Sequence, residues 1–461
     1  MATLLILVFV LGYLLIALEH NLHIDKAASA LITGTLCWAI LVLGWHQVPD
    51  HLVDAFNDFL HGHGGDGHGG LKVFFEHRLL HHMEEISSIL FFLLGAMTIV
   101  ELVDAHNGFA VITDRIKTRK KGRLLWIIAT LTFFFSAALD NLTTSIVMIS
   151  LLRKLIADKP TRWLFAGAVI ISANAGGAWS PIGDVTTTML WIGGQLTTPV
   201  IVTHLILPSI VCMVVPIGIM SMRMKGEVER PDQTDPDEAA DPTTQGERNL
   251  IFAMGVSGLL FVPVFKTVTH LPPFMGMMLS LGVLWLTTEV LHRSKNDQER
   301  SKLSVVGVLR KIDTASVMFF LGILLAVGAL QEAGHLIATA DWLRDSLGDV
   351  YLINIAIGLL SAIVDNVPLV AASMGMYEVA APGTMDAWMG FFVQDGIFWQ
   401  FLAYCAGTGG SALIIGSAAG VAVMGLEKID FVWYMKRMSL LAIAGYLAGA
   451  AVYWLMFGMG A

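Results

Sequence analysis

Long, continuous apolar runs are the feature that most constrains how this chain folds. A helix needs about 20 apolar residues to cross the hydrocarbon core of a bilayer. The runs do not alternate polar with apolar residues, as the strands of a membrane barrel do. The sequence therefore predicts an all-α polytopic protein whose first partner is the lipid bilayer. The clear spans are residues 3–18, 27–45, 86–103, 196–222, 250–269, 274–291, 314–330 and 431–457.

Composition excludes several other classes of protein. Only 14% of the residues are charged, against about 25% in a soluble domain. No basic face with interleaved aromatic residues is present, so we expect no nucleic-acid partner. The three cysteines, Cys37, Cys212 and Cys405, have no CxxC spacing, which argues against a zinc or disulfide framework. We expect no bound cofactor.

The distribution of basic residues predicts how the chain is oriented. Lysine and arginine cluster at residues 115–123, 153–162, 223–230, 293–311 and 436–437, whereas Lys72, Arg78, Arg344 and Lys266 lie on the opposite side. By the positive-inside rule the clusters are cytoplasmic. About ten transmembrane helices plus two re-entrant hairpins satisfy this division. The run at residues 3–18 is then a permanent span, and we expect a multi-pass protein of a bacterial cytoplasmic membrane with both termini outside.

An internal repeat divides the chain. Ser136-x-x-x-Asp140-Asn141 recurs as Ser361-x-x-x-Asp365-Asn366, and the glycine pattern Gly176-Gly177…Gly183 recurs as Gly409-Gly410…Gly416. Each half contains an odd number of membrane-crossing units, so the second half is predicted to be inverted. The predicted parts are a first repeat at 1–222, a Pro-, Asp- and Glu-rich cytoplasmic linker at 223–248, and a second repeat at 249–461. Inverted repeats with broken helices indicate a binding site near the bilayer midplane.

Two re-entrant hairpins are predicted, at residues 124–157 and 350–381. The apolar flanks of the first are short for a span, and basic residues lie at both of its ends. Its tip offers Asp140, Asn141 and Thr143, while the tip of the second offers Ser361, Asp365 and Asn366. Carboxylate, amide and hydroxyl oxygens are the ligands that small hard cations prefer. The alternative function for an aspartate at such a tip is to cap the helix that follows it.

Two broken helices are predicted, at residues 163–195 and 396–425, where apolar sequence runs into Gly, Ser, Pro and Asp. Polar candidates at the second break are Thr408 and Ser411, with Ser417 nearby. Those at the first break, where a carboxylate is also present, are Asn174, Ser180, Asp184, Thr186 and Thr187. The glycines alone could instead serve close helix packing.

Two other features have competing interpretations. Residues 46–82 carry eight histidines around a glycine-rich centre. A solvated, flexible loop is the simpler interpretation, with weak metal binding or pH sensing as the alternative. Asp184 and Asp365 could also form an intramembrane aspartyl protease, but Pro181 stands where such a motif requires glycine.

The motifs at these positions resemble those of the NhaD-type sodium/proton antiporters of the ion transporter superfamily. The resemblance rests on SAALDNLTTSIVM, SANAGGAWSPIGDVTTTMLWIGG, SAIVDNVPLVAA and GTGGSALIIGSAAGVA and extends over nearly the whole chain. It implies a secondary transporter, not an enzyme. It also implies exchange of Na⁺ and Li⁺ for H⁺ at alkaline pH, a homodimer and an elevator-like motion.

The resemblance leaves the transported substrate open. Other carriers of this superfamily transport a dicarboxylate, a citrate–metal complex or arsenite. Dicarboxylate-transporting relatives have serine where this chain has Asp140 and Asp365, and an acidic tip repels a carboxylate but attracts a cation. The hypothesis that follows is a Na⁺ site at Asp140, Asn141, Asp365 and Asn366.

Overall fold

The structure is a computed structural model that describes residues 2–17, 19–22, 24–44, 48–63, 67–113, 116–231 and 243–459. These residues are helices joined by turns, and no strand occurs among them beyond one isolated bridge between Lys120 and Glu227. Eight of the helices are long and apolar enough to cross a membrane. The predicted all-α fold is confirmed, and the chain is a multi-pass membrane protein.

The chain divides into two compact units, each assembled from segments that are distant in sequence. The first unit combines Met1–Leu90, Asp313–Ile353 and Val367–Ala380. Its helices are α1 (Ala2–Ala17), α2 (Glu19–Leu22), α3 (Lys26–Gly44), α4 (Val53–His63), the first part of α5 (Gly67–Ala105), α16 (Thr314–Glu332), α17 (His335–Leu347) and most of α19 (Asn366–Met376).

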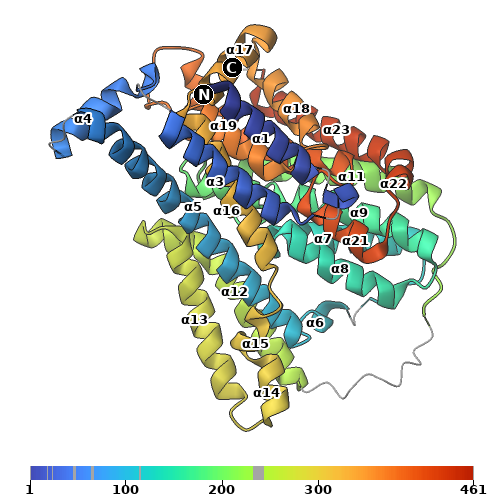
Figure 1. Ribbon diagram of the computed structural model, residues 1–461. Coiled ribbons are helices and arrows are strands. Elements are labelled where there is room, and N and C mark those ends of the chain that lie inside the picture. The colour runs from blue at the N-terminus through green and yellow to red at the C-terminus, as the bar shows by residue number, and fades with distance from the viewer. Residues whose placement is uncertain are drawn as a thin grey trace. The chain divides into compact units, whose positions relative to one another are not determined.

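The first unit is built around the crossing of α3 and α16, with α1 against α3 (Figure 1). Gly34 lies directly on the backbone of Gly322, so that any side chain at Gly34 would collide with the Gly322 carbonyl. Small residues at such a crossing let two membrane helices approach closely. Nearby, the Trp38 indole donates a hydrogen bond to the Leu325 carbonyl at 2.8 Å.

Helix α5 corrects the prediction of a flexible histidine-rich loop. Of the predicted loop 46–82, residues 50–63 form a short 3-10 turn and α4, and residues 67–82 belong to the long helix α5. Residues 46–47 and 64–66 lie outside the described part of the chain. Arg78 and His82 both contact Glu332 of α16, at 2.6 and 2.8 Å, and the Glu332 side chain is fully buried. A buried carboxylate needs such partners, and they hold α5 to α16 despite the poor helix propensity of glycine.

The second unit combines Phe91–Ile312, Asn354–Asn366 and Ala381–Ala461. It contains the predicted hairpin tips and helix breaks. Its helices, besides the end of α5 and most of α18 (Val350–Leu360), are α6 (Ala110–Thr113), α7 (Lys121–Leu139), α8 (Asn141–Leu155), α9 (Lys159–Gly177), α10 (Val185–Ile192), α11 (Thr198–Arg223), α12 (Gln245–Thr269), α13 (Pro273–Leu291), α14 (Asp297–Leu303), α15 (Val305–Leu309), α20 (Ile397–Gly409), α21 (Ala418–Glu427), α22 (Phe431–Arg437) and α23 (Ser439–Phe457).

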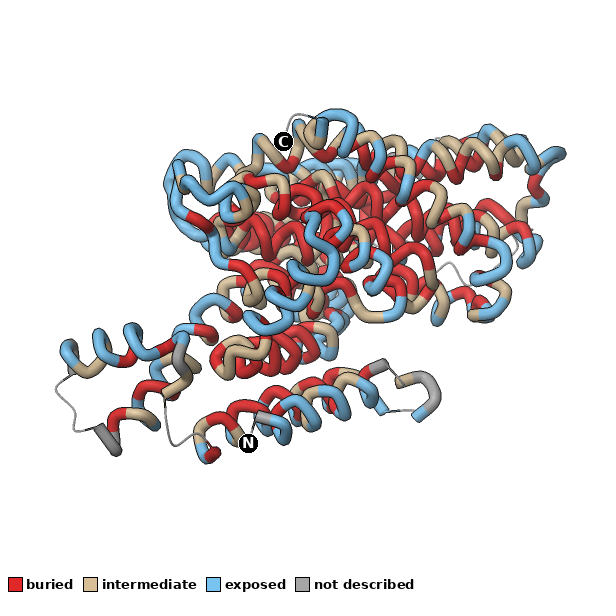
Figure 2. Tube along the Cα trace, turned by 90° about the horizontal axis from the view of Figure 1, so that it is seen from above, coloured by how far each residue is buried: buried red, intermediate tan, exposed pale blue. Residues whose placement is uncertain are grey.

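Burial distinguishes two kinds of helix in this unit. Some helices are buried on all sides, and others alternate buried with exposed residues (Figure 2). α9 is buried continuously from Phe165 to Gly177, and α20 from Phe398 to Gly409. A helix that is buried all round belongs to the core of a protein. Both of these helices lead into a predicted break, so the breaks begin inside the protein.

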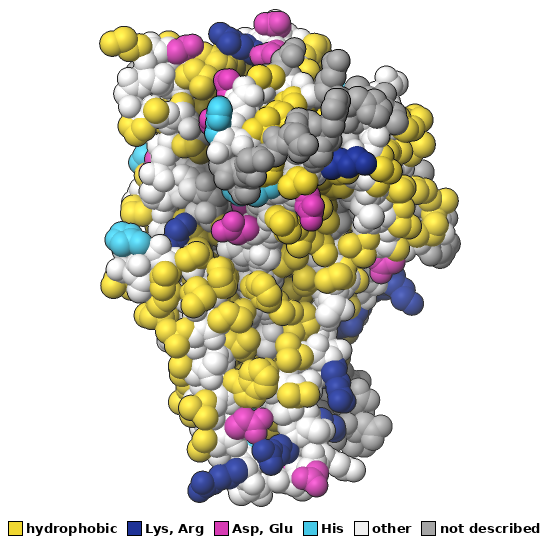
Figure 3. All heavy atoms as spheres, turned by 60° about the vertical axis from the view of Figure 1, so that its left-hand side comes forward, with side chains coloured by type: hydrophobic (Ala, Val, Ile, Leu, Met, Phe, Trp, Pro, Cys, Tyr) yellow, Lys and Arg dark blue, Asp and Glu magenta, His cyan; other side chains and the backbone are white. Residues whose placement is uncertain are grey.

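Helices α12 and α13 pack against each other as an antiparallel pair (Figure 1). Their outer surface is hydrophobic, with charged side chains gathered beyond one end (Figure 3). Exposed large apolar residues of this pair include Leu260, Val264, Val283 and Leu286. Such a surface, which water would not favour, is suited to lipid.

The predicted linker is partly ordered, which corrects the expectation of disorder over 223–248. Residues 226–230 hydrogen-bond with segments that precede them in the chain: the Gly226 carbonyl accepts from the Lys121 amide at 3.0 Å, and the Val228 amide donates to the Arg119 carbonyl at 2.8 Å. At the far end, Thr244 and Glu247 form a capping box that begins α12. Residues 232–242 lie outside the described residues.

Candidate functional site

The tip of the first hairpin is a single residue, Asp140, between α7 and α8. Its φ of 76° lies in a region that favours glycine. The carboxylate caps α8, since Oδ1 accepts the Thr143 amide at 2.8 Å and Oδ2 accepts the Thr143 hydroxyl at 2.7 Å. Asp140 therefore does cap a helix, at the expense of an unfavourable backbone conformation. Strained residues of this kind concentrate at functional sites.

The first broken helix places a second aspartate at a helix start. α9 ends at Gly177 and α10 begins at Val185, so residues 178–184 are the predicted interruption. Asp184 caps α10, accepting the Thr186 amide at 2.9 Å and the Thr186 hydroxyl at 2.8 Å through Oδ1. Gly177 allows the break to close on itself, because a side chain there would collide with the Gly183 carbonyl.

A chain of buried side-chain hydrogen bonds joins the two breaks. The Asn141 amide nitrogen donates to Asp184 Oδ2 at 2.6 Å and to Asn174 Oδ1 at 3.1 Å. The Asn174 amide nitrogen in turn donates to the hydroxyls of Ser411 and Ser417, each at 2.9 Å. All five residues are buried. Polar residues from the first hairpin tip and from both broken helices thus meet in one network.

Two further carboxylates, both half-buried, lie near enough to influence Asp184. Those of Asp140 and Asp365 both interact electrostatically with that of Asp184. Like charges in a buried region repel each other, and a bound cation or proton relieves that repulsion. The described residues contain no group of three His, Cys, Asp or Glu side chains arranged to hold a metal ion. A cation here would need hydroxyl, amide or backbone oxygens as further ligands.

Suitable oxygens are present. The buried hydroxyls of Thr144, Ser172 and Thr187 make no hydrogen bond within the described part of the protein, and the same is true of the Asn366 amide nitrogen. A buried polar atom without a partner is costly and calls for an explanation. Hydroxyl oxygens are among the ligands that a small hard cation accepts. Thr144 belongs to the predicted hairpin tip, whereas Ser172 was not among the predicted ligands, although it lies within a predicted motif.

The second half reproduces local features of the first. Ser136 donates to the Ala173 carbonyl at 2.6 Å, and Ser361 donates to the Ala406 carbonyl at 3.1 Å. Gly410 lies on the Gly416 carbonyl as Gly177 lies on that of Gly183. Ser417 caps α21 in the place that Asp184 has on α10. The site is consequently asymmetric in charge, with Asp184 in one half and a serine in the other.

Three predicted residues have other partners. Ser180 donates to the Ala137 carbonyl at 2.5 Å, which ties the break to the hairpin tip. Thr408 donates to the Tyr404 carbonyl of its own helix at 2.6 Å. Ser361 is occupied by the bond described above. These three side chains bond to backbone carbonyls and so help to fix the backbone around the site. The predicted residues that belong to the hydrogen-bond network are Asn141, Asn174, Asp184 and Ser411.

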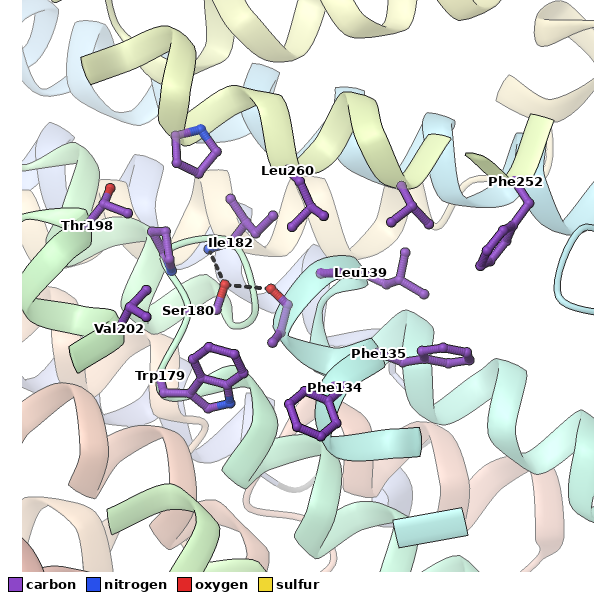
Figure 4. A pocket seen from close by; sticks show the side chains of 15 residues that line it. Phe134, Phe135, Leu139, Trp179, Ser180, Ile182, Thr198, Val202, Phe252 and Leu260 are labelled. Carbon is purple, nitrogen blue, oxygen red and sulfur yellow. Dashed lines mark hydrogen bonds between the residues drawn. The ribbon is translucent and has the colours of Figure 1, made fainter. Parts of the chain in front are cut away.

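An apolar pocket of about 400 Å³ lies beside the break, between α7, α11 and α12 (Figure 4). Phe134, Trp179, Phe252 and Leu260 are among its lining residues, and Ser180 contributes a hydroxyl that is already hydrogen-bonded. The pocket offers no set of oxygen ligands, so it is distinct from the polar network.

Comparisons with known proteins identify the family of the chain. A protein-family profile described as citrate transporter matches residues 3–393. Sodium/proton antiporter 1 of Arabidopsis thaliana is 47% identical over 97% of this chain and 71% of its own length. Sodium/proton antiporter 2 of the same plant is 43% identical over 97% of this chain and 98% of its own. The Na⁺/H⁺ antiporter NhaD of Vibrio cholerae is 30% identical over 98% of this chain and 91% of its own. The chain therefore belongs to the citrate transporter family and, within it, to the NhaD-type sodium/proton antiporters.

Proposed function

We propose that this protein exchanges Na⁺ for H⁺ across a membrane, with the ion site at the network around Asp184. The observation that carries the proposal is the buried hydrogen-bond chain from Asp184 through Asn141 and Asn174 to the serines of the second break. The relatives named as sodium/proton antiporters support it. Asp140 and Asp365 contribute negative charge, and the nearby hydroxyls contribute oxygen ligands.

Exchange requires a site that holds either ion but not both. A buried carboxylate meets this requirement, because burial disfavours its charged form until either a proton or a metal cation compensates the charge. Arrival of Na⁺ then displaces the proton, and arrival of the proton displaces Na⁺. Alternating access converts this competition into exchange when the site faces each side of the membrane in turn.

The family description raises citrate as a second candidate substrate. A citrate carrier needs positive or neutral hydrogen-bond donors at the substrate. Here the site gathers Asp140, Asp184 and Asp365, which repel a polycarboxylate. Free citrate is therefore disfavoured, and a citrate–metal complex would have to present its cation to these carboxylates.

The proposal also covers the ion range, the pH dependence, the oligomeric state and the membrane of residence. We infer that Li⁺ is also exchanged, that activity is greatest at alkaline pH, that the protein is a homodimer, and that it lies in a bacterial cytoplasmic membrane. Similarity to bacterial NhaD proteins supports this membrane, although the plant relatives are more similar in sequence. The resemblance to NhaD-type proteins motivates the ion range and the dimer.

A dequenching assay in everted vesicles tests the proposal. Na⁺, Li⁺, K⁺ and citrate are added in turn between pH 7 and 9.5, with D184N as the matched inactive variant. We expect Na⁺ and Li⁺ to dissipate the proton gradient, seen as recovery of fluorescence, in the wild type only. A response to citrate without added Na⁺, or equal responses in D184N, would reject the assignment.

A further inference from the structure

Lys266 lies in an unusual environment within the apolar helix α12. Its ammonium group donates a hydrogen bond to the Trp191 carbonyl at 2.6 Å and stands 4.5 Å from the centre of the Trp191 ring. Trp191 is itself 2% exposed. Lys266 belongs to the last turn of α12, where a lysine ordinarily extends toward the membrane interface, but here it contacts a neighbouring helix. Here the partners are the negative end of a helix, which favours a cation, and an aromatic face.

The helix that Lys266 contacts is α10, which also carries the ion-site carboxylate. α10 has eight residues, so it is about 12 Å long. Asp184 caps its first turn, and the Trp191 carbonyl belongs to its last turn. Lys266 therefore holds one end of a short rigid helix whose other end is part of the proposed ion site.

The equivalent half-helix of the second repeat, α21, is held differently. Its last carbonyls accept hydrogen bonds from Arg153 of α8, at Leu426, and from Trp163 of α9, at Glu427. Both α8 and α9 carry residues of the polar network. By contrast, α12 carries none of them. α21 is thus held within the group of helices that forms the site, whereas α10 packs against α20 of that group and also bonds to a helix outside it.

Helix α12 also packs against α7, next to the site. An apolar pocket lies between α12, which contributes Leu260, and the break, which contributes Ile182 (Figure 4). Side chains that face the pocket lack part of the dispersion contacts that a closed boundary would give them. The bond from Lys266 to Trp191 is a polar contact across this partly open boundary.

We propose that Lys266 is a positioning residue that latches α10 to α12 in this conformation and must release Trp191 when the ion site changes its exposure. This inference rests on the antiport function, since alternating access requires the helices of the site to move relative to others. Lys266 does not touch the proposed ligands. Its removal should change the balance between conformations rather than the chemistry of ion binding.

Spin-label distance measurements in proteoliposomes test the latch. Labels are attached at G193C and T269C, which flank the contact, since the native cysteines are buried. K266M keeps a side chain of similar length but removes the hydrogen-bond donor. We expect the fraction of molecules with the shortest label-to-label distance to fall at least about threefold, because a charge-assisted hydrogen bond is lost. The turnover number kcat should change by a similar factor. K266R should restore both, since arginine can also donate and stack.

Two controls separate the possible outcomes. T267M, at an exposed neighbour on α12, should leave distances and kcat unchanged. D184N should abolish exchange while keeping the short distance, so a failure of the ion site is distinguishable from a failure of the latch. The latch is refuted if K266M has the same distance distribution as T267M, even if its transport is lost. It is also refuted if folded K266R behaves like K266M.

Discussion

At the scale of single residues, the site depends on aspartates that have two tasks. Asp140 and Asp184 each cap a helix through a threonine, and each contributes charge to the buried network. From sequence, helix capping and ion binding are alternative functions for an aspartate at such a position. In the structure Asp140 and Asp184 cap helices, and we propose that they serve the ion site as well. Replacing these residues will therefore affect both stability and transport, and the two effects have to be measured separately.

Asparagine substitutions isolate the charge, because asparagine caps helices about as well as aspartate. We expect D140N, D184N and D365N each to abolish Na⁺-driven proton movement, with a loss of no more than about 1 kcal/mol of stability from the altered cap. Exchange is measured by dequenching, and folding by thermal melting in detergent. If both D140N and D365N kept near-normal exchange, the hairpin tips would not belong to the ion site.

The matched control is Asp313, which caps α16 in the same manner. Its carboxylate accepts the Ser316 amide at 3.0 Å and the Ser316 hydroxyl at 2.5 Å, but it belongs to the first unit. D313N should keep more than about half of the wild-type exchange rate, because only a surface cap is altered. A complete loss in well-folded D313N would show that capping, and not site charge, explains the other variants.

Asn141 connects the carboxylate of the site to the rest of the network, since it donates to both Asp184 and Asn174. N141A removes both bonds and leaves a buried carboxylate with one donor fewer, at a cost of about 1–3 kcal/mol. We expect a KM for Na⁺ raised at least about tenfold, measured in proteoliposomes over a range of Na⁺ concentrations. An unchanged KM would remove Asn141 from the site.

At the scale of helices, much of this architecture can be predicted from sequence. Short apolar flanks and paired Gly, Pro and Asp residues correctly marked the interruptions at Asp140 and at 178–184. The long α5 could not be predicted, since its glycine-rich start disfavours a helix and the contact of His82 with Glu332 joins residues far apart in sequence. Likewise, the bonds from Asn174 to Ser411 and Ser417 join residues more than 200 positions apart, and no local pattern reveals such pairing.

The close approach of Gly177 to Gly183 in the first broken helix can be tested by substitution. A methyl group at G177A would collide with the Gly183 backbone, so the turn must open, and we expect loss of more than about 2 kcal/mol of stability together with loss of exchange. G218A in α11 is the control, because no atom lies near its added methyl group, and alanine should stabilise that helix slightly. Equal melting temperatures for the two variants would contradict the close approach.

The re-entrant character of α7 and α8 remains a prediction. α7 extends to Lys121 and is long enough to span a bilayer by itself, so helix length alone does not decide the question. Cysteines at Lys120 and Lys159 should both react with an impermeant reagent from the cytoplasm, and one at Arg344 only from outside. Labelling of Lys120 and Lys159 from opposite sides would make residues 124–157 a true span and remove the basis for inverted repeats.

At the scale of the whole molecule, we propose that a helical membrane fold, two sets of broken helices and one buried acidic network together form a cation exchanger. Na⁺ and H⁺ then compete for a single acidic site. The signature of this competition is that the apparent affinity for Na⁺ rises as protons become scarce. Together with opposite fluxes of the two ions, this signature distinguishes an exchanger from a scaffold, a receptor or a citrate carrier.

The most direct test is therefore the KM for Na⁺ in proteoliposomes containing the purified protein, measured at several pH values with Na⁺ and H⁺ fluxes recorded together. We predict opposite fluxes of the two ions, a KM that falls several-fold for each unit of rising pH until it levels off, and no flux in D184N. A KM that is independent of pH, or Na⁺ and H⁺ moving in the same direction, would contradict exchange at one shared site.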